Sequence, residues 1–72
     1  VMNKVTELTL TDRIKALLEK YGSTQRWFVG KCVEAGIEMS DTKLSNRMTG
    51  AIEWTYEENK IIGDFLSENF NI

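Results

Sequence analysis

Histidine and proline are both absent from the sequence, and cysteine occurs once, at Cys32. Without histidine, a His-based catalytic triad, an imidazole metal ligand and a histidine pH switch are all excluded. A lone cysteine forms neither an internal disulfide nor a cysteine zinc site, and one free thiol fits a reducing cytoplasm. Apolar runs reach only three or four residues, so we expect neither a membrane-spanning helix nor a signal peptide. With no proline, long helices are permitted throughout.

The charge of the chain is small and unevenly placed. The 72 residues carry a net charge of −2, with 42% hydrophobic and 28% charged residues, which is ordinary for one globular domain. Residues 1–36 hold six Lys or Arg and four Asp or Glu, whereas residues 37–72 hold three and seven. Proteins dedicated to nucleic-acid binding are usually basic, because neutralised phosphates supply most of their affinity. The acidic half therefore favours a basic partner surface.

The chain begins with an unpatterned stretch. Residues 1–10 are predicted to form an N-terminal arm, with Leu8 and Leu10 packed on the core of a domain at 11–72. Thr11 is the expected N-cap of a first helix over 11–21, and Asp12 in its first turn suits the helix dipole. Gly22 is the expected stop. The spacing i, i+3, i+4, i+7 places on one helical face Ile14, Leu17, Leu18 and Tyr21.

Three further helices are predicted from their capping residues. Thr24 and Ser40 each precede a helical pattern, and Thr55 with Glu58 forms a capping box. No segment alternates with period two, so we predict an all-α domain of four helices with a short fifth piece. Gly30 lies inside the second predicted helix, and we expect another segment of backbone to approach the helix closely at this residue. The residues expected to point inward are Trp27, Phe28, Cys32, Val33, Ile37, Met39, Leu44, Met48, Ile52, Ile61, Ile62, Phe65 and Leu66.

No group of residues indicates catalysis. Cys32 has no histidine to act as its base. Glu57 and Glu58 are adjacent on a predicted helix and point about 100° apart, which is unsuited to paired-carboxylate chemistry. We therefore expect a binding protein that uses no metal, no cofactor and no small-molecule substrate.

Several features occur together in an order typical of one family. Thr24-Gln25 opens a helix with Phe28 in the core, and a Ser-capped helix follows in which Leu44 precedes Gly50 by six residues. A short linker and an amphipathic helix come next. Over residues 11–70 this order resembles the Cro/repressor-type helix-turn-helix family of phages. The resemblance implies that the second and third helices form a DNA-reading unit, with Gln25 on a phosphate and the exposed side of 41–47 in the major groove.

The chain departs from the family pattern in three ways. The interval from Gln25 to Leu44 is about five residues longer than usual for the family, Val29 replaces a smaller residue, and Asp41 lies where groove-facing residues are expected. An aspartate accepts from cytosine N4 but repels phosphate. With its long turn, small size and acidic balance, the chain resembles the antirepressors of lactococcal temperate phages more than a basic Cro. The resemblance implies binding to the DNA-binding domain of the repressor encoded opposite the antirepressor.

Two functions follow from the resemblance. The first is an antirepressor that binds the repressor's DNA-binding domain; the second is a Cro-like repressor that binds operator DNA, alone or jointly with that repressor. The alternative for the polar candidate residues is that they form a solvated surface with no binding role. The carboxylates of 53–68 likewise form either a solvated face or a patch that docks on a basic protein surface. The candidate partner-binding residues are Gln25, Arg26, Trp27, Met39, Asp41, Thr42, Lys43, Ser45, Asn46 and Arg47.

Overall fold

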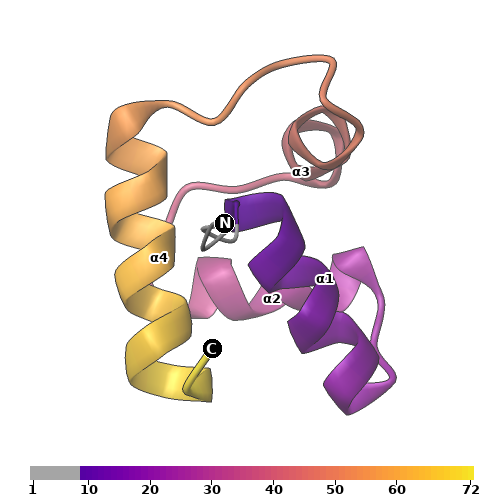
Figure 1. Cartoon of the computed structure of the whole chain (residues 1–72), viewed down its shortest axis with the longest axis vertical. Coiled ribbons are helices and arrows are strands. Elements are labelled where there is room, and N and C mark those ends of the chain that lie inside the picture. Colours follow the sequence, from indigo (N-terminus) through magenta and orange to yellow (C-terminus); the bar gives the residue numbers. More distant parts are fainter. Residues whose placement is uncertain (1–8) are drawn as a thin grey trace, which may run out of the picture.

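Four helices and no strand make up residues 9–72, the part of the chain that the computed structural model describes. They are α1 (Leu10–Tyr21), α2 (Gln25–Glu34), α3 (Asp41–Thr49) and α4 (Tyr56–Phe70). The prediction of an all-α chain is confirmed, although no fifth helix follows within the described residues. In Figure 1, α4 runs along one side of the molecule, and α1 and α2 lie beside it. Residues 1–8 of the expected arm, Leu8 included, lie outside the described part.

Three of the four predicted caps are confirmed. The side-chain oxygens of Thr24, Ser40 and Thr55 each accept from the backbone N–H three residues on, at 3.3, 3.1 and 3.1 Å. At α4 the capping box is complete, because the Glu58 carboxylate accepts from the Thr55 N–H at 2.9 Å. Each of these caps therefore satisfies one of the N–H groups that the first turn of a helix leaves without an intrahelical acceptor, and α2, α3 and α4 start where their sequence signals stand.

The predicted N-cap of α1 was wrong by two residues. Thr9 is the N-cap: its hydroxyl accepts from the Asp12 N–H at 3.1 Å, and the Asp12 carboxylate accepts from the Thr9 N–H at 3.4 Å. This box uses Thr9 and Asp12 together, whereas a cap at Thr11 would leave Asp12 without that role. Leu10 is consequently the first residue of α1, 3% exposed, and no part of an arm.

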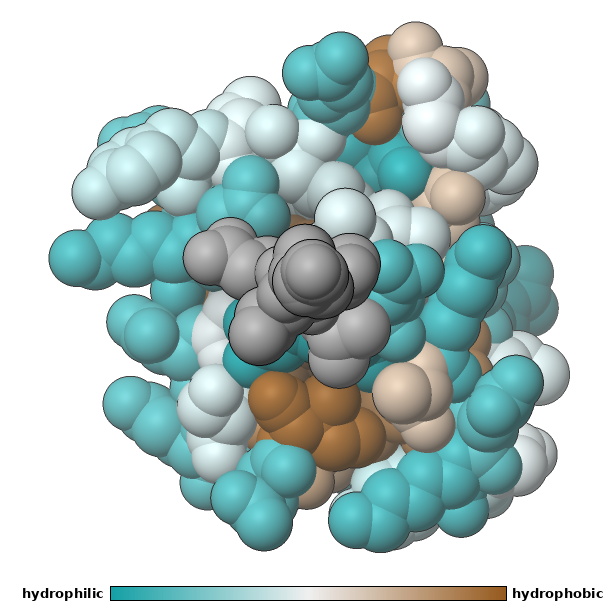
Figure 2. All heavy atoms as spheres, in the orientation of Figure 1, coloured by the Kyte–Doolittle hydropathy of each residue, from teal (hydrophilic) through white to brown (hydrophobic). Residues whose placement is uncertain are grey.

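The core lies where the helices meet, and the side chains that residues 9–72 bury in it are all apolar. α1 packs against α4, and α2 packs against α3. Phe28 is fully buried and touches the ring of Phe65, with centroids 6.2 Å apart. Figure 2 shows a mostly hydrophilic surface in this view, with a small apolar area in the space between α4 and α1. The buried apolar side chains are Leu10, Ile14, Leu17, Phe28, Cys32, Met39, Leu44, Ile62 and Leu66.

Some residues expected to be buried are exposed. Val33, Ile52 and Ile61 are 58%, 47% and 53% exposed. Val33 and Ile61 directly adjoin the buried Cys32 and Ile62, and neighbours on a helix point about 100° apart, so only one of each pair faces the core. The expected close approach at Gly30 is also wrong, because a Cβ added there would have no heavy atom within 4 Å.

An arginine joins α1 to α4. The Arg13 guanidinium donates from Nη2 to the carbonyl oxygens of Gly63 and Ile72, both at 3.0 Å, and to Ser67 Oγ at 2.9 Å. Gly63 is buried, and a Cβ at this position would lie 3.0 Å from Arg13 Nη1. The missing side chain of Gly63 therefore makes the room in which the guanidinium sits.

The Cys32 thiol is expected to be inert in the folded chain. It is 0% exposed, and burial raises its pKa from 9.0 to about 11. A rise of that size lowers the thiolate fraction near pH 8 by about 100-fold. Reaction with a disulfide reagent should therefore be slow in buffer and fast in denaturing urea. Equal rates in the two conditions would contradict the buried position.

Candidate macromolecule-binding surface

One side of α3 is exposed and rich in hydroxyl groups. Asp41, Thr42, Ser45 and Thr49 are all exposed, and their spacing of i, i+1, i+4, i+8 places them within about 100° of the helix circumference. Leu44, which lies outside this part of the circumference, is 0% exposed and anchors the helix to the core. Three hydroxyls and one carboxylate therefore face solvent along the length of α3.

The first turn of α2 adjoins this side of α3. Arg26 Nη2 lies 3.5 Å from Asp41 Oδ2, and their side chains are 86% and 56% exposed. So exposed an ion pair contributes little to stability, but it places the start of α2 beside the start of α3. We call the combined surface the α2–α3 face; its residues are Gln25, Arg26, Asp41, Thr42, Ser45 and Thr49.

Both cations of α3 turn away from this face toward α4. Arg47 donates from Nε to Glu58 Oε1 and from Nη2 to Glu58 Oε2, each at 3.0 Å. Lys43 Nζ lies 3.2 Å from the same Oε2. The side chains of Arg47 and Glu58 are 12% and 14% exposed, and that of Lys43 is 28% exposed. The structure thus gives Arg47 and Lys43 a role inside the fold that the sequence analysis did not foresee.

The two cations, Arg47 and Lys43, strongly favour the ionised form of Glu58. The bidentate hydrogen bond from Arg47 is the largest cause, and together with the Thr55 N–H and Lys43 it lowers the pKa of Glu58 from 4.5 to about 2, against an opposing effect of burial. Fork-to-fork pairing of guanidinium and carboxylate is the strongest common side-chain hydrogen bond. The carboxylate of Glu58 therefore has two roles: it joins α4 to α3, and it caps the N-terminus of α4.

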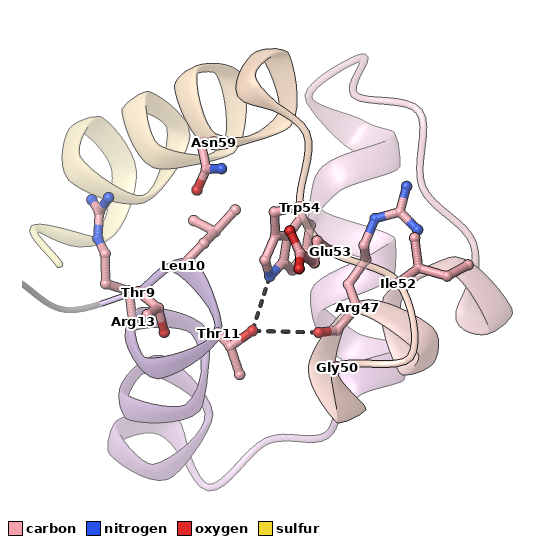
Figure 3. Close-up of a pocket in the computed structure, with 10 residues that line it drawn as sticks. All are labelled: Thr9, Leu10, Thr11, Arg13, Arg47, Gly50, Ile52, Glu53, Trp54 and Asn59. Atoms are coloured by element: carbon pink, nitrogen blue, oxygen red, sulfur yellow. Dashed lines mark hydrogen bonds between the residues drawn. The ribbon is translucent and has the colours of Figure 1, made fainter.

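A hydrogen-bonded node on the other side of Arg47 holds α1 to the connection between α3 and α4. Trp54 Nε1 donates to Thr11 Oγ1 at 2.9 Å, and that hydroxyl donates to the Arg47 carbonyl oxygen at 3.5 Å. Figure 3 shows both contacts, with the Arg47 guanidinium pointing away from them. The node lines a cavity of about 500 Å³ between α1 and the connection.

Two expected apolar contact residues lie elsewhere. Met39 is 8% exposed and belongs to the core, so it is no exposed anchor. Trp27 is half-buried, with its ring centroid 5.8 Å from that of Tyr21 and 5.9 Å from that of Phe70. Asn46 is also half-buried, and its carbonyl oxygen accepts from the Ile52 N–H at 3.2 Å.

Sequence reasoning missed the role of Glu58 in the pairing. It identified Glu58 only as part of a capping box, and the partner Arg47 lies in another helix. One local signal was available: Lys43 and Arg47 are four residues apart and lie on one side of α3, which is the spacing for a shared anion. Which acidic residue lies between Lys43 and Arg47 depends on the path of residues 50–55, and no sequence motif predicts that path.

Comparison with protein-family models, with curated proteins and with solved structures gave no match. Within residues 9–72, no three histidine, cysteine, aspartate or glutamate side chains are grouped as a metal site would require. None of the helices in that part of the chain has the length and apolar character to cross a membrane.

Proposed function

We propose that the chain is a small phage regulator of the Cro/repressor helix-turn-helix type that acts as an antirepressor. In this proposal α2, the connection 35–40 and α3 form the helix-turn-helix unit. The α2–α3 face binds the DNA-binding domain of the repressor and keeps that domain off its operator. The connection between Glu34 and Asp41 has six residues, which is longer than the three- or four-residue turn common in helix-turn-helix units.

The charge of α3 supports a protein partner over DNA. Phosphate contacts by Lys and Arg supply most of the affinity of a DNA-binding helix. Here both cations of α3 are paired with Glu58, and Arg26 is the one cation of the α2–α3 face, beside the carboxylate of Asp41. The hydroxyls of Thr42 and Ser45 and the carboxylate of Asp41 suit the Arg, Lys and Gln side chains of a DNA-binding surface.

Direct operator binding is the second candidate, and one observation favours it. Gln25 and Arg26 are exposed at the N-terminus of α2, where free N–H groups and the helix dipole attract phosphate. A mobility-shift assay separates the two functions. It uses the operator region next to the gene at two salt concentrations, with this chain alone, the neighbouring repressor alone, and both together.

The two candidates give opposite results in that assay. An antirepressor shifts nothing alone and releases the repressor from DNA. A Cro-like protein shifts the operator by itself, and log K falls by about 0.9 per neutralised phosphate as log salt rises. Release of the repressor without a shift by this chain is the expected result.

Replacing Ser45 by arginine should disrupt binding of the repressor. Ser45 is exposed in the middle of the α2–α3 face, so Ser45→Arg adds bulk and a charge that meets the repressor's cations. We expect at least about tenfold weaker binding by calorimetry, since like charges placed together in an interface cost several kcal/mol and about 1.4 kcal/mol corresponds to a tenfold change in affinity. Ala16→Arg, at an exposed position of α1, is the matched control and should bind as the parent does. An equal loss of repressor binding in both variants would contradict an interface on α3.

A further inference from the structure

A second surface, apart from the α2–α3 face, lies where the connection between α2 and α3 meets the first turns of α4. It is a groove of about 390 Å³. Ile37, Ile61 and Ile62 form its apolar wall, and Glu38 and Glu57 stand at its rim. Ile62 is 1% exposed and belongs to the core, whereas Ile61 is 53% exposed and offers its side chain to a ligand. We refer to this feature as the α4 groove.

The α4 groove continues into a stripe along α4. Glu57, Ile61, Asp64 and Glu68 are all exposed, and their spacing of i, i+4, i+7, i+11 places them on one face of the helix. An exposed isoleucine is thus flanked by a carboxylate on one side and by two on the other. Lys60 is the one cation in the sequence of α4.

Apart from Glu58, the carboxylates of the described residues at this surface have no cation bound to them. Among the described residues, ion pairs within 4.0 Å involve neither Glu38, Glu57, Asp64 nor Glu68. Lys43 is the cation that lines the groove, and it is already paired with Glu58 at 3.2 Å. The exposed field of the groove and stripe is therefore negative around an apolar centre.

We propose that the α4 groove binds a basic amphipathic helix of a partner protein. One leucine or isoleucine of that helix fills the groove against Ile37 and Ile61, and lysines or arginines one turn to either side meet Glu57 and Asp64. A groove commonly recognises an amphipathic helix through apolar anchor residues of the helix, with charged residues on either side of them. A second copy of this chain fits poorly, because the same acidic stripe would face itself.

The test titrates the full, isotope-labelled chain with a synthetic helical peptide of leucine and lysine, about four turns or fourteen residues long. Its counterpart with glutamate in place of lysine is the control peptide. We expect saturable changes in the amide signals of 36–38 and 57–64 with the first peptide, weaker at high salt, and none with the second. Changes centred on the α2–α3 face, binding of both peptides alike, or signals that already move with protein concentration alone would each overturn the proposal.

Two isoleucines of similar exposure give a matched pair of variants. Ile61→Ser removes the apolar contact of the groove, and Ile52→Ser removes an isoleucine that is 47% exposed on the connection between α3 and α4. Ile61→Ser should weaken peptide binding about tenfold, whereas Ile52→Ser should leave it within about twofold. Equal effects of the two substitutions would overturn the assignment to the groove.

Failure of this proposal is distinguishable from failure of the proposed function. Ser45→Arg changes the α2–α3 face and should leave peptide binding intact. Ile61→Ser should leave binding of the repressor through the α2–α3 face intact. Loss of peptide binding in Ser45→Arg would mean that the two surfaces are one, which would overturn the separate site.

Discussion

Replacing Glu58 by alanine is expected to lower the free energy of unfolding by about 3 kcal/mol at neutral pH. The substitution removes the carboxylate that Arg47 and Lys43 share, and it leaves the guanidinium of Arg47, 12% exposed, without a partner. It also removes half of the capping box of α4. Urea unfolding followed by circular dichroism measures the change, and an unchanged midpoint would contradict a stabilising role for the pair. Glu57→Ala is the control, because Glu57 is exposed and forms no ion pair among the described residues.

The pH dependence of stability identifies the origin of that loss. The pKa of Glu58 falls from 4.5 in the unfolded chain to about 2 in the folded one. The unfolded state therefore takes up the proton first, so the stabilisation is complete above about 4.5 and disappears as the pH falls toward 2. Parent and Glu58→Ala should differ most near neutral pH and converge in acid. A difference that stayed constant with pH would assign the effect to packing and not to charge.

Replacing Phe28 by alanine should lower the free energy of unfolding by about 4 kcal/mol. Phe28 is fully buried in α2 and packs on Phe65 of α4, so its removal leaves a cavity where these helices meet. A chain of 72 residues has a total stability of roughly 4–11 kcal/mol. The variant should therefore be substantially unfolded on mild heating, as thermal unfolding would show.

Tyr56→Ala is the comparison for that variant. Tyr56 is 82% exposed in the first turn of α4, so its removal should change stability by less than about 0.5 kcal/mol. A similar loss in both variants would show that aromatic residues support the fold regardless of burial, which contradicts the core described above.

Local signals in the sequence predicted most of the helical framework. Thr24, Ser40 and Thr55 were identified as caps because a side-chain oxygen and the N–H groups it satisfies lie within one turn. The start of α1 was misplaced because Thr9 and Thr11 both precede Asp12 in a suitable context. In the fold, Thr9 forms the capping box with Asp12, whereas the hydroxyl of Thr11 accepts from Trp54 Nε1, 43 residues away in the sequence.

The charge of the candidate surface could not be predicted in the same way. Composition indicated an acidic second half, but the pairing of Arg47 with Glu58 depends on how α4 returns past α3. Helical periodicity likewise placed Ile61 and Ile62 together on an apolar stripe, although only Ile62 meets the core. The spacing of apolar residues locates the buried face of a helix to within about a quarter turn. Packing against the other helices then decides which edge of that face is buried.

The carboxylate that holds both cations of α3 also has an evolutionary consequence. A glutamate codon becomes a glutamine or a lysine codon by one nucleotide substitution. Either change at Glu58 removes the anion that neutralises Arg47 and Lys43, with no change in α3 itself. The electrostatic character of the third helix can therefore diverge between descendants of one gene through a single mutation in the fourth.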